Sequence, residues 1–482
     1  MFLHFNKLAS RYSCKSVNLV KQLNNIDKWA KALNNYSVVH FVSTANMNVM
    51  KFSDYDCIGF DLDNTLLRYN VTNLVHFEYD TLAKYMVEKK GYSAKHLLKP
   101  LDTADLDFMQ KGLMMDFEKG NILKVTCDGS IQRATHGSKL LNMEDIESIY
   151  PNKRWHVIDS FCNDMLSTWN GPMSMQMRPL LDYFDMPSSL IFARAVDAQD
   201  EKGIPQDCYR IWPDMLEGLI EMYNKDHFQS GQGNFFSAIK SNPKKYIHKC
   251  SPRTISWLQD LKKKQKIFLI TGSNIDFANF TASYAFGDDW KSLFDIIICY
   301  AKKPGFFTSN RPFLTLLDYK ESGPISGKNL QQGGTYSQGN WKDLYEFFTC
   351  ITGKIEPRCL YIGDNLVQDI YVPSACTTCD VIAVVDEQIS EGMLNVGLSH
   401  DNKDIINSQF WGSYFCFKDS DSFVNTLWNY VIQTYSKICI PAIEEVAKMN
   451  LDEPLNSFNK NDRKFSGYHP AIPIVVSTMT NN

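Results

Sequence analysis

The chain has 482 residues, about three times the length of a typical domain, so we expect more than one packed unit. A composition of 44% hydrophobic and 22% charged residues is that of a globular protein and excludes a fibrous or wholly disordered chain. Fifty basic and 54 acidic residues give a net charge of −4, which argues against a nucleic-acid binder. No apolar stretch approaches the roughly 20 residues that a bilayer crossing needs. We therefore expect neither a nucleic-acid nor a membrane partner.

The cysteines do not form a recognisable metal or disulfide pattern. Thirteen of them are scattered along the chain. The close pair Cys376 and Cys379 has neither a second such pair nor spaced histidines to complete a zinc site. We interpret them as free thiols in a reducing compartment, and a cytoplasmic location is expected.

The N-terminal segment differs from the rest in charge. Residues 1–50 contain six Lys or Arg and one acid, Asp27. A basic, Ser-containing, acid-poor segment is typical of an organelle transit peptide, which makes a mitochondrial location the alternative. A disordered extension explains it equally well. So does a start site placed too far upstream, since Met47 and Met50 stand just before the first predicted strand.

Short apolar runs alternate with helical patterns in most of the chain. Residues 57–60 form an apolar run that ends in acids, which predicts a buried strand, and a helix is predicted over 77–90. Four later runs, rich in β-branched residues, are separated by helix-like segments such as 252–265 and 341–352; they cover residues 267–270, 295–299, 359–362 and 381–385. This alternation predicts an α/β fold, with a Rossmann-like parallel sheet and helices on both faces.

About 200 residues separate the first two of these strands, too many for one crossover, so we expect a large inserted α+β unit. It contains helical stretches near 143–149 and 212–226 and a hairpin turn at 126–130. The expected organisation is therefore a basic extension over 1–50, a core from 51–75 and 252–400, an insert over 76–251, and a C-terminal helical segment and tail over 401–482.

Two later segments are harder to assign. Residues 304–340 are rich in Gly and Pro, which predicts a long irregular loop of the functional or mobile kind. Residues 421–449 show a helical pattern interrupted at Pro441.

The first predicted strand ends in two acids that are candidates for catalysis. Asp61-Leu-Asp63-Asn-Thr65 places two carboxylates two residues apart, so on an extended backbone they point the same way. The carboxyl end of a parallel strand is where open α/β sheets bind ligands. One carboxylate can act as a nucleophile and the other as a general acid and base, but both stay ionised together only beside a cation such as Mg²⁺. The alternative is an acid-rich turn at a strand end.

Three later strand ends carry complementary groups. Thr271-Gly-Ser273 offers hydroxyls and backbone amides for a phosphoryl oxygen. Lys303, before Pro304, can neutralise a phosphate and a nucleophilic carboxylate. Asp364 follows the fourth strand directly, and Asp369 lies about a turn further on. Each has an ordinary structural explanation as a turn, cap or solvated loop, but their order along the chain makes them support one another.

This order of motifs resembles the haloacid dehalogenase-like superfamily of aspartyl phosphatases. Further stretches are similar to the cytosolic purine 5'-nucleotidase family: Gly59-Phe-Asp-Leu-Asp-Asn-Thr-Leu, Thr135-His-Gly137 with Lys139, Lys302-Lys303-Pro304-Gly-Phe-Phe307, Tyr336-Ser-Gln-Gly-Asn340 and Tyr361-Ile-Gly-Asp364. The likeness runs from about Met47 to about Asp386 and leaves out residues 1–46. The core is therefore expected to be haloacid dehalogenase-like and the insert to be a cap over the site.

The resemblance also implies roles for single residues. Asp61 corresponds to the nucleophile, and Asp63 to the acid and base whose main-chain carbonyl also binds Mg²⁺. Thr271 and Lys303 correspond to the phosphate-binding pair, with Thr65 and Ser273 as further substrate contacts. Asp364 corresponds to the acidic Mg²⁺ ligand, and Asp369 is expected behind the direct ligands. Residue 64 is Asn where the purine nucleotidases have an aromatic residue, and their long acidic C-terminal tail is absent, so the preferred base and sugar stay open.

His136 follows a predicted hairpin strand and is a candidate for a substrate contact from the cap; a packed or surface histidine is the commoner fate. The function expected from all these residues is a Mg²⁺-dependent phosphatase that hydrolyses nucleoside 5'-monophosphates through an aspartyl phosphate. The alternatives are a binding or scaffold protein on the same fold and a phosphatase or phosphotransferase for another small phosphate ester. Whether the chain forms a homo-oligomer is left open.

Overall fold

The computed structural model describes residues 49–391, 408–419, 422–459 and 467–478. The segment 1–46, for which a transit peptide is one interpretation, lies outside these residues. Among the helices of the described ranges, none has both the length and the apolar character needed to cross a bilayer.

A nine-stranded sheet forms the centre of the protein, in the order β11-β10-β12-β9-β8-β2-β13-β14-β17. Seven neighbouring strands, from β12 to β17, are parallel. Their bounds are Gly334–Gln338 (β12), Ile296–Cys299 (β9), Lys266–Ile270 (β8), Cys57–Phe60 (β2), Cys359–Gly363 (β13), Asp380–Val384 (β14) and Ile438–Ile440 (β17). The antiparallel strands β10 (Phe313–Leu317) and β11 (Lys320–Ile325) extend the sheet beyond β12.

Helices cover both faces of this sheet, which confirms the predicted fold class. Successive residues of β8 enter different cores: Ile267 packs in the same cluster as Trp257 of α14 (Pro252–Lys264), whereas the Phe268 ring lies 4.8 Å from that of Phe348 in α17 (Trp341–Thr352). This alternation follows from the two-residue period of a strand, so a strand that is apolar throughout needs a helical layer on each side. The remaining helices near the core are α15 (Ile275–Phe286), α16 (Gly305–Thr308), α18 (Val372–Cys376), α19 (Glu387–Ser390), α21 (Leu427–Tyr435), α22 (Ile443–Val446) and α23 (Ile474–Thr478).

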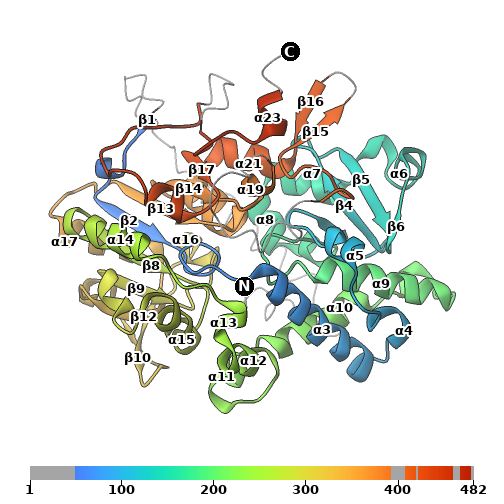
Figure 1. Cartoon of the computed structure of the whole chain (residues 1–482), viewed down its shortest axis with the longest axis horizontal. Coiled ribbons are helices and arrows are strands. Elements are labelled where there is room, and N and C mark those ends of the chain that lie inside the picture. Colours follow the sequence, from blue (N-terminus) through green and yellow to red (C-terminus); the bar gives the residue numbers. More distant parts are fainter. Residues whose placement is uncertain (1–48, 392–407, 420–421, 460–466, 479–482) are drawn as a thin grey trace, which may run out of the picture.

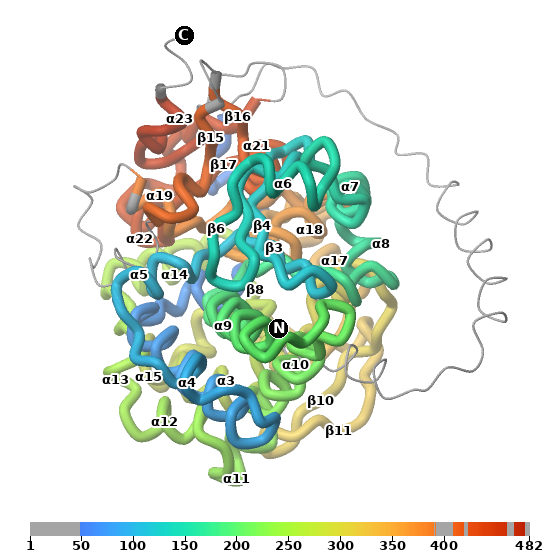
Figure 2. Tube along the Cα trace, turned by 90° about the vertical axis from the view of Figure 1, so that its right-hand side faces the viewer, coloured from blue at the N-terminus to red at the C-terminus, as the bar shows by residue number. Residues whose placement is uncertain are grey.

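Most of the chain between β2 and β8 builds a second unit, on the right of the core in Figure 1 and in front of it in Figure 2. Its antiparallel sheet has the order β6-β5-β4-β3-β7. The strands are Met114–Asp116 (β3), Asn121–Val125 (β4), Ile131–His136 (β5), Lys139–Leu140 (β6) and Met177–Pro179 (β7). The predicted hairpin at 126–130 is confirmed, because it joins β4 to β5. The helices are Val71–Lys90 (α3), Ala94–Leu97 (α4), Thr103–Phe108 (α5), Met143–Ile149 (α6), His156–Asn163 (α7), Met165–Asn170 (α8), Ser188–Glu201 (α9), Ile211–Met222 (α10), Asp226–Ser230 (α11), Phe235–Ser241 (α12) and Pro243–Tyr246 (α13).

A C-terminal segment ties this second unit to the core. The buried Lys124 on β4 donates to the carbonyl oxygens of Trp411, Gly412 and Ser413 at 3.2, 3.0 and 2.7 Å. Trp428 of α21 donates from its indole N–H to the carbonyl of Gly112 at 2.7 Å. Buried ammonium and carbonyl groups need such partners, so these bonds fix how the two units sit together. The small strand pairs β15 (Cys416–Asp419) with β16 (Ser422–Asn425) and β1 (Val49–Met50) with β18 (Leu455–Asn456) complete the described strands.

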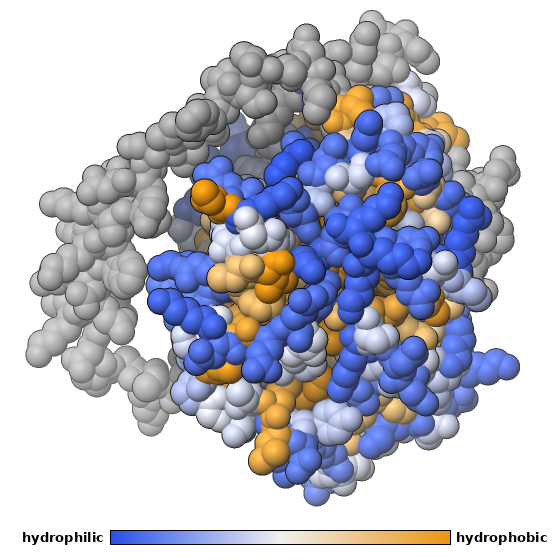
Figure 3. Space-filling model, turned by 90° about the vertical axis from the view of Figure 1, so that its left-hand side faces the viewer, coloured by the Kyte–Doolittle hydropathy of each residue, from blue (hydrophilic) through white to orange (hydrophobic). Residues whose placement is uncertain are grey.

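The side of the core that faces away from the insert carries mostly hydrophilic residues, with small apolar groups between them (Figure 3). The exposed large apolar side chains of the described residues, such as Leu317 and Ile355, are scattered along the chain. Single exposed apolar residues of this kind are normal for a globular surface.

Two expectations for the later part of the chain are wrong in part. Residues 304–340 are not one irregular loop, because they contain α16 and strands β10, β11 and β12. Within the helical pattern of 421–449, residues 422–425 form β16, and residues 438–440 form β17, which pairs with β14 as the last strand of the sheet. A three-residue strand has too little pattern to be distinguished from a helical turn, and its pairing partner lies more than 50 residues away.

Candidate active site

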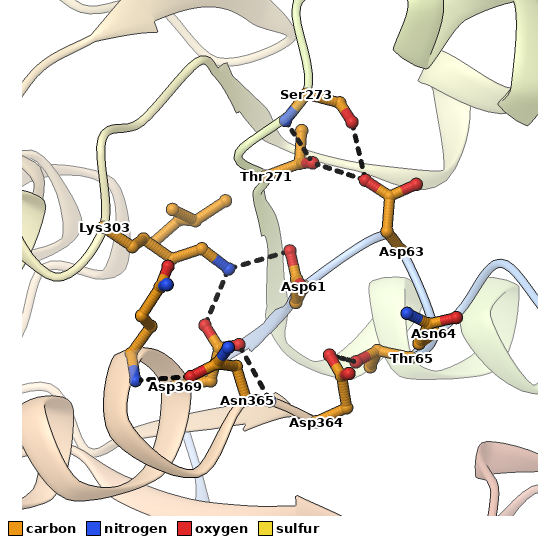
Figure 4. Close-up of polar contacts among 12 residues, drawn as sticks. Asp61, Asp63, Asn64, Thr65, Thr271, Ser273, Lys303, Asp364, Asn365 and Asp369 are labelled. Carbon is orange, nitrogen blue, oxygen red and sulfur yellow. Dashed lines mark hydrogen bonds and ion pairs between the residues drawn. The ribbon is translucent and has the colours of Figure 1, made fainter. Parts of the chain in front are cut away.

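The four sequence motifs meet at one edge of the sheet because β9, β8, β2 and β13 are neighbours and run parallel. Asp61 follows β2, Thr271 follows β8, Lys303 lies in the loop after β9 and Asp364 follows β13. Figure 4 shows their side chains pointing toward one another at the carboxyl ends of these strands. The structure thus brings together residues more than 300 positions apart.

A cavity opens over these residues at the carboxyl ends of the strands. The core supplies acids, Lys303 and Ser273 to its wall. The insert adds Asp182 and two aromatic rings, and Phe277 of α15 adds a third. The three rings of this wall are Phe184, Phe235 and Phe277.

Lys303 is the cation at the centre of the site. Its Nζ lies 2.9 Å from Asp61 Oδ1 and donates to Asp369 Oδ1 at 2.6 Å and to the hydroxyl of Tyr361 at 3.3 Å. Burial alone would lower the pKa of Lys303, but the carboxylates of Asp369 and Asp61 outweigh it and hold the pKa above its usual value. Lys303 is therefore charged at neutral pH and can neutralise an anion bound beside Asp61.

The acids around Lys303 could hold a metal ion. Oxygen atoms of Asp61, Asp364 and Asp369 lie within 4.8 Å of one another, and all three side chains are buried. Burial raises the pKa of Asp61 to about 7, although Lys303 opposes the shift. Burial also raises the pKa of Asp364, and its buried Oδ2 has no hydrogen-bond partner among the described residues. Crowded carboxylates with an unsatisfied oxygen suit a hard divalent cation such as Mg²⁺, so the donor set fits the expected cofactor.

Asp63 points away from Lys303, toward Thr271 and Ser273 (Figure 4). Its Oδ2 accepts from the hydroxyl of Ser273 at 2.6 Å and of Thr271 at 3.4 Å, and its Oδ1 accepts from Tyr69 at 2.8 Å. Thr65 instead donates to Asp364 Oδ1 at 3.5 Å. The two motif carboxylates therefore have separate surroundings: Asp61 faces Lys303, and Asp63 faces hydroxyl groups.

Asp369 sits directly against the end of β13. It lies in the π-helix Leu366–Tyr371 and accepts from the backbone N–H of Asn365 at 3.3 Å and from the hydroxyl of Tyr361 at 3.2 Å. A Cβ at Gly363 would lie 2.4 Å from the Cβ of Asp369, so only glycine leaves room for it. Asp369 is thus fixed by the local chain and holds Lys303 in place.

The structure does not bring His136 into the cavity, contrary to the expectation of a substrate contact. Its Nδ1 lies 2.8 Å from Asn121 Oδ1 and its Nε2 lies 3.0 Å from Asp200 Oδ2. The ring therefore links β5 to α9 within the insert, and it is not among the residues lining the cavity. The alternative of a packed or surface histidine describes it better.

Several site residues escaped the sequence-based prediction. Tyr361 could have been predicted, since it stands in the fourth motif. Tyr69, Asp182 and the aromatic wall carry no local signal, because only the folded insert and the neighbouring loops bring them to the cavity.

The sequence pattern of the 5' nucleotidase family matches residues 45–404. The chain belongs to the 5' nucleotidase family. Human and bovine 5'-nucleotidase domain-containing protein 1 are 34% and 35% identical to it over 448 and 444 residues, which cover 88% of this chain and 96% of each relative. Rat 5'-nucleotidase domain-containing protein 2 is 27% identical over 329 residues, or 67% of this chain and 55% of that protein.

Family membership confirms the resemblance and, at the level of the family, the expectation of an enzyme of the 5'-nucleotidase type. The matched range includes all four motifs.

Proposed function

We propose that this 5' nucleotidase family member is a Mg²⁺-dependent phosphatase of nucleoside 5'-monophosphates that works through an aspartyl phosphate on Asp61. The observation that carries the proposal is the position of Asp61, whose Oδ1 lies 2.9 Å from the Lys303 ammonium in a cavity also lined by Asp364 and Asp369. Phosphoryl transfer depends mostly on positioning and charge neutralisation, which these groups can supply.

The proton and phosphoryl transfers divide between the two motif carboxylates. Asp61 attacks phosphorus with one carboxylate oxygen, while Lys303 and Thr271 bind phosphoryl oxygens. Asp63 gives a proton to the departing 5'-oxygen and then takes one from the water that hydrolyses the acyl phosphate. The hydroxyls of Ser273 and Tyr69 hold the Asp63 carboxylate in position for both steps.

Mg²⁺ would be held by Asp61, Asp364 and the main-chain carbonyl of Asp63. Asp369 would not bind the ion directly but would hold Lys303 in place beside Asp61. The cation supplies charge neutralisation for the phosphate and the attacking carboxylate. The unsatisfied buried oxygen of Asp364 supports this assignment over a site without metal.

We propose further that residues 76–251 act as a cap over this site. The aromatic wall, to which the cap contributes Phe184 and Phe235, favours a nucleoside over a small sugar or an alkyl group, because rings of this kind bury a planar base. A scaffold protein would not need a charged, buried Lys303 between two acids, since apolar packing is often at least as stable as a buried ion-pair cluster.

A phosphate-release screen tests the proposal. Nucleoside 5'-monophosphates, sugar phosphates and p-nitrophenyl phosphate are incubated with the full chain and Mg²⁺, and with Asp61→Asn as the matched inactive control. We expect release from nucleotides by the wild type and at least a thousandfold less by the variant. Release from sugar phosphates alone would favour the small-ester alternative, and no release from any substrate would favour the scaffold.

A further inference from the structure

Asp182 is a cap residue with one carboxylate oxygen left over at the catalytic cavity. It lies between β7 and α9 and lines the cavity beside Asp61, Asp63 and Asp364. Its Oδ1 accepts from the side-chain amide of Asn64 and from the backbone N–H of Phe184, both at 3.3 Å. No donor among the described residues reaches its Oδ2.

The charges of the cavity do not balance within the described residues. Five aspartates line it, and the single ammonium on its wall, Lys303, is shared by Asp61 and Asp369. The nearby ammonium of Lys111 lies 3.2 Å from Glu387. Asp182 and Asp364 are thus left facing the same cavity, and Asp364 has a buried Oδ2 without a partner. A divalent cation bound in the cavity would offset the charge of both acids.

We propose that Asp182 is the contribution of the cap to the divalent-cation site, so that cation binding and the position of the cap loop 182–185 are coupled. The inference rests on the cation site of the proposed function, to which it adds a third chain segment. Asn64 orients the carboxylate, and its free oxygen accepts hydrogen bonds from the hydration shell that Mg²⁺ retains in proteins. Asp182 is therefore a positioning residue for the cation and the loop.

Tyr183, the residue after Asp182, connects the cap loop to the core. Tyr183 donates from its hydroxyl to Asp386 Oδ2 at 2.9 Å, and Asp386 also pairs with Arg68 at 2.8 Å. The loop is thus anchored to the core at Tyr183, while Asp182 and Phe184 on either side face the cavity. A change in the position of Asp182 on cation binding therefore also moves the ring of Phe184.

Cation binding is measured directly, without turnover. Mg²⁺ is titrated calorimetrically into the full-length wild type, Asp182→Asn and the control Asp207→Asn, which removes an exposed acid from the same cap. We expect about tenfold weaker binding in Asp182→Asn and no change in the control. Hydrogen–deuterium exchange then reports on residues 180–187: Mg²⁺ should slow it in the wild type and much less in Asp182→Asn. Equal melting temperatures without Mg²⁺ show that the variants are folded.

Unchanged Mg²⁺ affinity in Asp182→Asn overturns the proposal, and so does exchange in the wild-type loop that ignores Mg²⁺. If affinity is unchanged but the variant loses a preference for ribonucleotides over 2'-deoxynucleotides, Asp182 is a sugar ligand instead. A wild type that binds Mg²⁺ but releases no phosphate would refute the proposed function and leave the coupling standing.

Discussion

Ser273 donates from its hydroxyl to Asp63 Oδ2 at 2.6 Å, the shortest of the three hydroxyl contacts to this carboxylate. The bond joins the first motif to the second across the neighbouring strands β2 and β8. It turns Asp63 away from Lys303 and separates it from Asp61 (Figure 4). Two carboxylates two residues apart can therefore carry different roles.

Replacing Asp63 by Asn should separate the two proton transfers. A nucleotide needs the acid because its 5'-oxygen is a poor leaving group, whereas p-nitrophenolate leaves without a proton. Both substrates share one phosphoenzyme, whose hydrolysis needs the base. Rapid-mixing absorbance should thus show a stoichiometric burst of p-nitrophenol followed by a stall, while nucleotides give neither burst nor turnover.

Ser273→Ala is the matched control, since it removes the hydroxyl that holds Asp63 and keeps the carboxylate. We expect slower turnover, by about tenfold, without a stall after the first cycle. Equal slowing of both substrates by Asp63→Asn, with no burst, would assign Asp63 to the cation or to local structure.

Asp61→Asn should stabilise the cation-free protein at high pH. The pKa of Asp61 is raised from 3.8 to about 7, mainly by burial, so between these values the folded protein holds a proton that the unfolded chain has lost. Ionising Asp61 in the folded state therefore costs stability as pH rises from about 4 to 7, by at most about 4 kcal/mol. The Asn variant has no such loss.

Melting temperatures in EDTA at pH 5 and pH 8 measure this effect. The variant should gain on the wild type between the two pH values, and added Mg²⁺ should stabilise the wild type more than the variant. A difference between the two proteins that is the same at both pH values would show that burial does not penalise the Asp61 charge.

Asp364→Ala should weaken the binding of Mg²⁺, because Asp61 would be the one remaining side-chain carboxylate ligand; the third proposed ligand is the main-chain carbonyl of Asp63. We expect the half-saturating Mg²⁺ concentration for phosphate release to rise at least tenfold. Thr65→Val, which loses only the 3.5 Å bond to Asp364, should shift it far less. An unchanged half-saturating concentration in Asp364→Ala would remove this residue from the site.

The transit-peptide interpretation of the basic N-terminal segment can be tested with a fluorescent fusion. If residues 1–46 are a transit peptide, their fusion to a fluorescent protein should enter mitochondria. A fusion in which the six basic residues are replaced by Gln serves as the control. Diffuse fluorescence from the unaltered fusion would favour the extension or start-site interpretation.

Much of the core was predictable because its signals are local. The strands that became β2, β8, β9, β13 and β14 are short apolar runs, and the first four are each followed by one of the motif residues of the site. Parallel pairing brings the carboxyl ends of neighbouring strands to one edge, so recognising the strands was enough to gather Asp61, Thr271, Lys303 and Asp364.

Other features depend on contacts between distant segments, and the sequence alone did not determine them. β17 is three residues long and becomes a strand through its pairing with β14. His136 stands in a motif that suggested a substrate contact, but the folded insert places Asn121 and Asp200 on either side of its ring.

The sequence by itself determined which residues are candidates for the site, since their types and their positions after apolar strands mark them. Only the tertiary structure decided what covers that site. The cap loop reaches the cavity through Asn64 and Tyr183, and this packing brings Asp182 and the aromatic wall opposite the acids. Such contacts depend on the shapes of two folded units, and no periodicity or spacing within either unit records them.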